Sequence, residues 1–146
     1  MRNHKKKLGQ HFLNDKNIIN KIIMSIKPKK TDSFLEIGPG EGALTTPLLD
    51  MIKDIVLIEK DKDLIPLLQS QYIESNNVKI INNDILKCNL SNYLFDKTRI
   101  IGNLPYNIST EIIFKLLPVT SDITDMHLML QKEVVDRMVA NPGSKV

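Results

Sequence analysis

The chain has 146 residues, of which 42% are hydrophobic and 25% charged, and it carries a formal net charge of +3. These values are typical of one soluble globular domain and exclude a disordered or fibrous chain, while the mild positive charge permits a polyanionic partner without requiring one. No apolar run approaches the roughly 18 residues of a membrane helix and no secretory signal opens the chain, so we expect a cytoplasmic protein that does not bind membranes.

The chain begins with a basic arm. Five basic side chains lie within the first seven residues: Arg2, His4, Lys5, Lys6 and Lys7. Such a block can neutralise RNA phosphates, although the same pattern also fits a solvated terminus. A helix is expected next, because Asn14 or Asp15 can cap it, the isoleucines between 18 and 26 recur at helical spacing, and Pro28 ends it.

Strand-like and helix-like segments alternate through the rest of the chain. The expected strands are 33–37, 55–58, 78–81, 99–102 and 126–130. The expected helices are 43–52, a helix capped by Asp61 that runs through Gln71, 109–117 and 133–140. This alternation predicts an α/β fold with a parallel, doubly wound sheet, in which ligands bind outside the carboxyl ends of the strands. Cys88, the single cysteine, is expected to be a small buried apolar residue.

The first expected strand ends in a glycine loop. Gly38, Gly40 and Gly42 let the backbone turn sharply and approach a ligand without side chains in the way. Gly38, Gly40 and Ala43 also satisfy the dinucleotide pattern G-x-G-x-x-G/A, and an ordinary strand-to-helix turn fits as well. The glycine pattern alone therefore does not identify a cofactor.

Acidic residues follow the next two expected strands. Glu59 ends the second strand, where its carboxylate can accept hydrogen bonds from both hydroxyls of a ribose. Asp84 follows the third strand, where it can accept a hydrogen bond from the amino group of an adenine. Taken singly, each fits an exposed strand end or a turn. Three ligand-like groups at three successive strand ends favour a nucleoside site.

After the fourth strand, Asn103-Leu104-Pro105-Tyr106 resembles the N-L-P-Y signature of methyltransferases that modify the exocyclic amino group of adenine. That chemistry needs acceptors for the amino hydrogens, because the nitrogen lone pair is delocalised into the ring. Asn103 Oδ1 and the Leu104 carbonyl would supply them. Pro105 would direct both groups, and Tyr106 would stack on the base. The methyl donor is a sulfonium, so we expect no metal site. A turn leading into a helix is the structural alternative.

Four stretches, one of them around the NLPY motif, make the resemblance specific to one family. Gly9-Gln10-His11-Phe12-Leu13 resembles the GQ[NH]FL motif of the bacterial small-subunit rRNA adenine dimethyltransferases associated with kasugamycin sensitivity. EIGPG, IGNLPYNIST and MHLMLQKEVVDRM resemble the same family, so the resemblance covers residues 6–146. It implies a Rossmann-like methyltransferase that uses S-adenosylmethionine.

The resemblance also implies a role for each site residue. The cofactor-binding residues would be His11, Leu13, Gly38, Glu59, Asp84 and Asn103. The catalytic residues would be Asn103, Leu104, Pro105 and Tyr106. In the family pattern, His11 and Leu13 close over the cofactor, Gly38 contacts its methionine end, and Asn103 contacts both the cofactor and the target base.

The family pattern divides the chain into a basic arm with the GQHFL motif, residues 1–14, and a Rossmann-like domain, residues 15–146. Relatives continue with a strand hairpin, a further aromatic residue near the target pocket and a helical domain, so we expect a domain incomplete at its C-terminus. We expect a monomer that acts on small-subunit rRNA in an assembling ribosomal subunit. A large-subunit enzyme of the macrolide-resistance type and a catalytically silent RNA-binding fragment are the alternatives. An NAD-dependent dehydrogenase would not explain NLPY or GQHFL.

Overall fold

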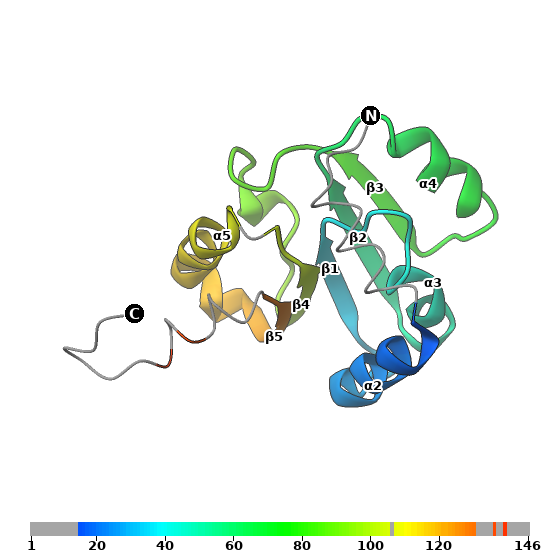
Figure 1. The fold of residues 1–146 in the computed structure, drawn as a ribbon, viewed down its shortest axis with the longest axis horizontal. Coiled ribbons are helices and arrows are strands. Elements are labelled where there is room, and N and C mark those ends of the chain that lie inside the picture. The colour runs from blue at the N-terminus through cyan, green and yellow to red at the C-terminus, as the bar shows by residue number, and fades with distance from the viewer. Residues whose placement is uncertain (1–14, 106, 131–135, 137–138, 140–146) are drawn as a thin grey trace.

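The computed structural model describes residues 15–105 and 107–130, together with Asp136 and Val139. The basic arm, Tyr106 and all but two residues of the helix expected at 133–140 lie outside the described residues. Helices and strands alternate along the chain (Figure 1): α2 (Lys16–Ile26), β1 (Ser33–Ile37), α3 (Thr45–Leu48), η1 (Leu49–Met51), β2 (Asp54–Glu59), α4 (Ile65–Gln71), β3 (Val78–Asn82), η2 (Leu90–Asn92), β4 (Thr98–Asn103), α5 (Ser109–Leu116), η3 (Leu117–Asp122) and β5 (Ile123–Met129).

The five strands form one sheet in the order β3-β2-β1-β4-β5, and every neighbouring pair is parallel. The chain runs outward from β1 to β3 and then returns to the other side of β1 as β4, so the strand order reverses between β1 and β4. A ligand site is expected at the carboxyl ends of the strands beside this switch point. The predicted doubly wound, Rossmann-like architecture is confirmed.

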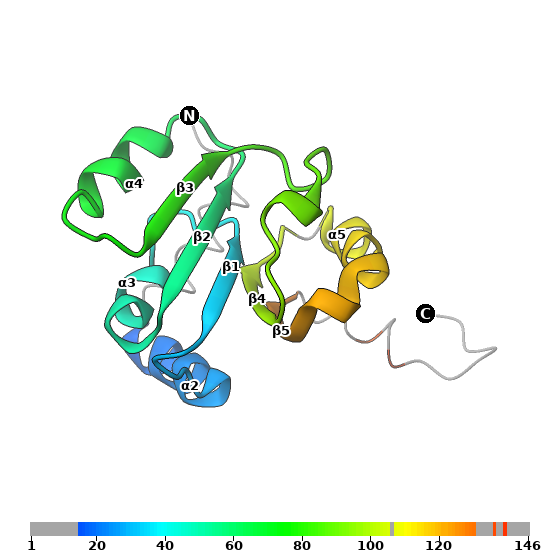
Figure 2. The same cartoon turned by 180° about the vertical axis from the view of Figure 1, so that it is seen from behind.

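Helices cover both faces of the sheet (Figure 2). On one face, Ile26 of α2, Leu48 of α3 and Leu68 of α4 belong to the same buried cluster. On the opposite face, Cys88 and residues of α5 such as Ile112 join a second buried cluster, as expected for the cysteine. The central strands are therefore buried on both sides, which explains their nearly continuous apolar sequence. No helix in the described part of the chain is long and apolar enough to cross a membrane.

Local sequence signals account for most of the element boundaries. Asp15 caps α2, because its Oδ1 accepts hydrogen bonds from the N–H groups of Asn17 at 2.8 Å and Ile18 at 3.4 Å. The helix ends at Lys27, which adopts a left-handed conformation with φ of 51° just before Pro28. Helix and cap were both predicted, and both are confirmed.

Two helix starts were predicted wrongly. The helix expected at 43–52 is only α3 followed by the 3-10 helix η1, because residues 40–44 form turns and Pro47 removes a backbone donor. Asp61 does not cap α4: its Oδ1 accepts from the Asp63 N–H at 2.9 Å within a turn, and the helix begins at Ile65. Pro66 lies in the first helical turn, where a missing N–H costs little.

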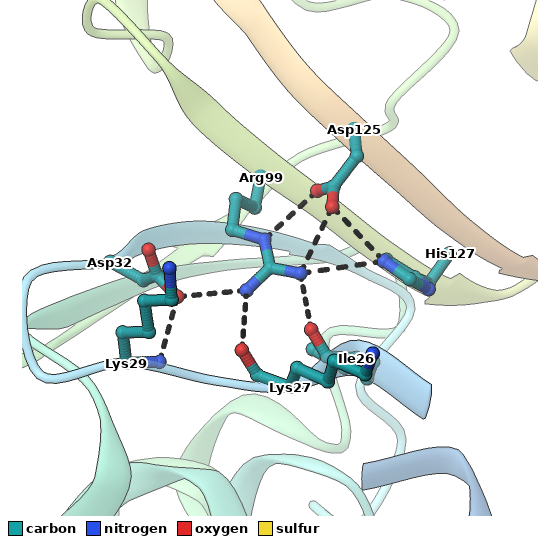
Figure 3. A network of polar contacts seen from close by, with 7 residues as sticks. All are labelled: Ile26, Lys27, Lys29, Asp32, Arg99, Asp125 and His127. Carbon is teal, nitrogen blue, oxygen red and sulfur yellow. Dashed lines mark hydrogen bonds and ion pairs between the residues drawn. The ribbon is translucent and has the colours of Figure 1, made fainter. Parts of the chain in front are cut away.

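A buried arginine joins the amino end of the sheet to α2 (Figure 3). Arg99 of β4 binds Asp125 of β5 through Nε and Nη2, each at 2.9 Å, and its Nη1 binds Asp32 Oδ2 at 2.8 Å. The same guanidinium donates to the carbonyls of Ile26 and Lys27 at the end of α2. One side chain thus links α2, the entry to β1, and both strands β4 and β5.

Candidate active site

The end of β1 and the end of β4 meet at the switch point. Gly38 has φ of +66°, and its N–H donates to the Ile58 carbonyl of β2 at 2.9 Å. A Cβ atom at Gly38 would lie 3.8 Å from the carbonyl oxygen of Asn103. Gly40 also has a positive φ, +61°, and a Cβ there would meet no heavy atom of the described residues within 4 Å. The described part of the chain therefore leaves the side that Gly40 faces clear.

Glu59, the last residue of β2, is turned toward this loop. It is 6% exposed, its Oε1 accepts from the Gly40 N–H at 3.1 Å, and its Oε2 accepts from the Asp61 N–H at 2.9 Å. A carboxylate has about four lone-pair sites, so acceptor capacity remains for a ligand. The sequence placed the glycine loop and Glu59 at the ends of two successive strands, and the structure brings Gly40 and Glu59 into direct contact.

Asp84 lies after β3 on the same edge of the sheet. Its Oδ1 accepts from the Leu86 N–H at 3.0 Å, and Lys60 Nζ lies 3.5 Å from its Oδ2. The Leu86 hydrogen bond, and secondarily Lys60, hold the pKa of Asp84 below its usual value. Asn82 Nδ2 donates to the Glu59 carbonyl at 2.9 Å and so ties the ends of β2 and β3 together. Asp84 is thus a charged acceptor on the same edge of the sheet as Glu59.

Asn103 is the last residue of β4 and is half-buried. The next residue, Leu104, is buried and donates from its N–H to the Met129 carbonyl at 3.1 Å, which ties the segment to β5. Among the described residues, the Asn103 side-chain amide makes no hydrogen bond. The exposed Pro105 leads into α5. Tyr106, His11 and Leu13 lie outside the described residues. The six other predicted site residues lie at or just after the carboxyl ends of β1 to β4: Gly38, Glu59, Asp84, Asn103, Leu104 and Pro105.

A second buried carboxyl group lies under the glycine loop, and the sequence did not single it out. Glu36 of β1 is 2% exposed and accepts a hydrogen bond from Thr45 Oγ1 of α3. Burial raises the pKa of Glu36 to about 7, and the charge of Glu59 adds to the rise, against the Thr45 hydrogen bond. The signal was present, because Glu36 is the only charged residue in the strand sequence SFLEI.

Replacing Glu36 with glutamine should stabilise the protein at alkaline pH. The folded pKa of about 7 exceeds the ordinary 4.5, so the contribution of Glu36 to stability is fully present below pH 4.5 and is lost as the pH rises through 7. Each tenfold change in proton affinity corresponds to about 1.4 kcal/mol, so the loss amounts to about 3 kcal/mol. Glutamine keeps an acceptor for Thr45. Urea denaturation should show that the variant is more stable than the original chain at pH 8.5 but not at pH 4.5. A stability difference that does not change with pH would contradict this.

Comparison with known proteins identifies the family. The family model described as ribosomal RNA adenine dimethylase matches residues 1–146. A ribosomal RNA small subunit methyltransferase A from Coxiella burnetii is 48% identical over 141 residues, which are 96% of this chain and 55% of that protein.

Solved structures agree with this assignment. A dimethyladenosine transferase from Plasmodium falciparum superimposes with a TM-score of 0.76 at 34% identity, covering 89% of this chain and 46% of that one. A 23S rRNA methyltransferase, ErmE, superimposes with a TM-score of 0.77 at 24% identity, covering 90% of this chain and 52% of that one, and shows the fold alone. The chain spans about half the length of the curated relatives it matches. It belongs to the ribosomal RNA adenine dimethylase family.

Proposed function

We propose that this chain is the cofactor-binding part of an enzyme that transfers methyl groups from S-adenosylmethionine to the N6 atoms of adenines in small-subunit rRNA during ribosome assembly. One observation carries the proposal: in a member of this family, Gly38, Glu59, Asp84 and Asn103 lie together at the carboxyl ends of β1 to β4. We further propose that the enzyme is monomeric and that it is cytoplasmic, since the sequence has no apolar run of membrane-helix length.

The described residues fit a nucleoside cofactor. Gly38 and Gly40 leave room for the methionine end, since neither carries a side chain and no other described residue lies within 4 Å of a Cβ placed at Gly40. Glu59 has acceptor capacity for the two ribose hydroxyls, and Asp84 can accept from the adenine amino group. His11 and Leu13 would close over the cofactor, as the resemblance implies. When bound, S-adenosylmethionine supplies an activated methyl group on a sulfonium.

The target base would be oriented by the residues after β4. Asn103 Oδ1 and the Leu104 carbonyl would accept the two hydrogens of the adenine amino group and direct its lone pair toward the methyl group. Tyr106 would stack on the base, and Pro105 would hold the turn that presents these groups. The amino proton would leave to solvent after transfer. Orientation and electrostatics would then account for most of the rate enhancement.

The percentage sequence identities favour the small-subunit substrate over the large-subunit alternative. The small-subunit methyltransferase from Coxiella burnetii is 48% identical to this chain, whereas the large-subunit enzyme is 24% identical. A tritiated-methyl transfer assay on immature small subunits, with a chain of the relatives' full length, tests the proposal. Incorporation into N6-methylated adenine is the expected result. Tight binding to immature subunits with no incorporation would instead support the silent RNA-binding alternative.

Replacing Glu59 with alanine should weaken binding of S-adenosylhomocysteine by about 1–3 kcal/mol, because two ribose hydroxyls lose their acceptor. Calorimetry measures this loss. Glu74→Ala, which removes an exposed carboxylate between α4 and β3, is the matched control and should bind as the unsubstituted chain does. Unchanged affinity in Glu59→Ala would rule out the proposed contact with the ribose. Binding of NAD in place of S-adenosylhomocysteine would contradict the proposed cofactor.

A further inference from the structure

Two side chains at the C-terminal end of α4, Gln71 and Tyr72, contact the glycine loop. Gly42 is buried with φ of +89°, and a Cβ atom there would collide with the hydroxyl of Tyr72 and lie 3.0 Å from Gln71 Nε2. The two side chains therefore occupy the space that a side chain at Gly42 would need. Tyr72 itself is 6% exposed, so its hydroxyl is held in place by the surrounding core.

Both side chains form hydrogen bonds to the loop and to the first turn of α3. The Tyr72 hydroxyl lies 2.8 Å from Thr46 Oγ1 and donates to the Gly42 carbonyl at 3.4 Å. Gln71 Nε2 donates to the Glu41 carbonyl at 3.1 Å and to Thr46 Oγ1 at 3.2 Å. Burial raises the pKa of Tyr72 above its ordinary value, so the hydroxyl keeps its proton and remains a donor.

The loop is thus held at two places along the chain. Glu59 accepts a hydrogen bond from Gly40, and Tyr72 with Gln71 donates hydrogen bonds to residues 41–46. Gly38, Gly40 and Gly42 all adopt positive φ angles. Because glycine populates positive and negative φ about equally, this segment has little intrinsic preference for one conformation. An unsupported loop would lose conformational entropy on binding a ligand, and that loss weakens affinity.

We propose that Tyr72 and Gln71 are positioning residues of the cofactor site, which hold the glycine loop in the conformation that accepts S-adenosylmethionine. The inference rests on the proposed function of the loop. Neither side chain needs to touch the cofactor, because both act through the backbone of residues 41–46. Their effect is therefore on cofactor affinity and not on the methyl-transfer step.

The test compares Tyr72→Phe and Gln71→Ala with matched controls. Phenylalanine keeps the buried ring and removes only the hydroxyl, and Gln71 is exposed, so both variants should fold. Tyr93→Phe, on the opposite face of the sheet, and Gln69→Ala, exposed on α4, are the controls. Each test variant should raise the Kd for S-adenosylhomocysteine roughly 3- to 10-fold, the range for one hydrogen bond, with both controls unchanged.

Two further readouts separate positioning from general stability. Hydrogen exchange of residues 38–46 in the free protein should become faster in the test variants only. In a chain of the relatives' full length, KM for S-adenosylmethionine should rise while kcat stays within about twofold. If the unsubstituted chain binds no S-adenosylhomocysteine, the proposed function and this inference both fail. If it binds, and both test variants bind equally well, this inference alone is overturned.

Discussion

In a chain of the relatives' full length, Asn103→Ala should lower the rate of methyl transfer roughly 100- to 1000-fold, because it removes one acceptor that acts on the target amino group in the transition state. Loss of one such group typically costs about 2.7–4 kcal/mol. Asn103 ends β4 beside Gly38, where the proposed cofactor and target would meet. Single-turnover transfer of a tritiated methyl group to immature small subunits measures the effect.

The loss should be one of catalysis and not of folding. Among the described residues the Asn103 side chain makes no hydrogen bond, so its removal leaves no buried partner in that part of the chain unsatisfied. Circular dichroism and the melting temperature should therefore match those of the unsubstituted protein. Asn92→Ala, which removes an exposed amide at the end of η2, should retain full activity. A rate within threefold of the original for Asn103→Ala would exclude the proposed role.

Arg99→Ala should lower the free energy of unfolding by about 3 kcal/mol, near the lower end of the range for breaking a buried ion pair. The Arg99 and Asp32 side chains are 10% and 18% exposed, but Asp125 is 38% exposed and is partly solvated. Arg99 also lies 5.0 Å from the centre of the Phe34 ring, a cation–π contact that the variant loses. Urea denaturation at neutral pH measures the difference.

The pH dependence of this difference is the sharper test. Burial acts to raise the pKa of Asp125, but hydrogen bonds from Arg99 and His127 outweigh it and lower the pKa. The stabilisation is therefore present above the ordinary pKa of 3.8 and is lost as the pH falls through the lower folded value. The stability difference between Arg99→Ala and the original chain should therefore shrink at acid pH, leaving the part due to the Ile26 and Lys27 carbonyls and the Phe34 ring, which do not titrate. Lys79→Ala, an exposed strand lysine, should change stability by no more than about 0.5 kcal/mol. A constant difference between pH 7 and pH 2.5 would contradict the ion-pair account.

Local signals explain why element types were easier to predict than element boundaries. Asp15 and Pro28 mark the limits of α2 by chemistry that acts within a few residues, so that helix was predicted closely. The helix expected at 43–52 was wrong because the prediction relied on the apolar pattern and gave too little weight to Pro47 and the glycine turns, and the structure has only the short α3 and η1 there. Strand β5 begins at Ile123, earlier than the expected 126, since hydrogen bonding to β4 extends it over more polar residues. The sequence of one strand does not specify how far it pairs with a neighbouring strand.

The sequence by itself determined the α/β class and the parallel doubly wound sheet, because strands that alternate with helices place all their carboxyl ends on one side. It also predicted Gly38, Glu59, Asp84 and Asn103 as residues of the proposed site, since glycine turns and polar side chains at strand ends are recognisable from chain order alone. Only the tertiary structure decided which groups support that site. Glu36 under the loop, Tyr72 and Gln71 beside Gly42, and the Arg99 network all depend on contacts between residues far apart in the chain. Burial and proximity of this kind arise from packing, and no local pattern encodes them.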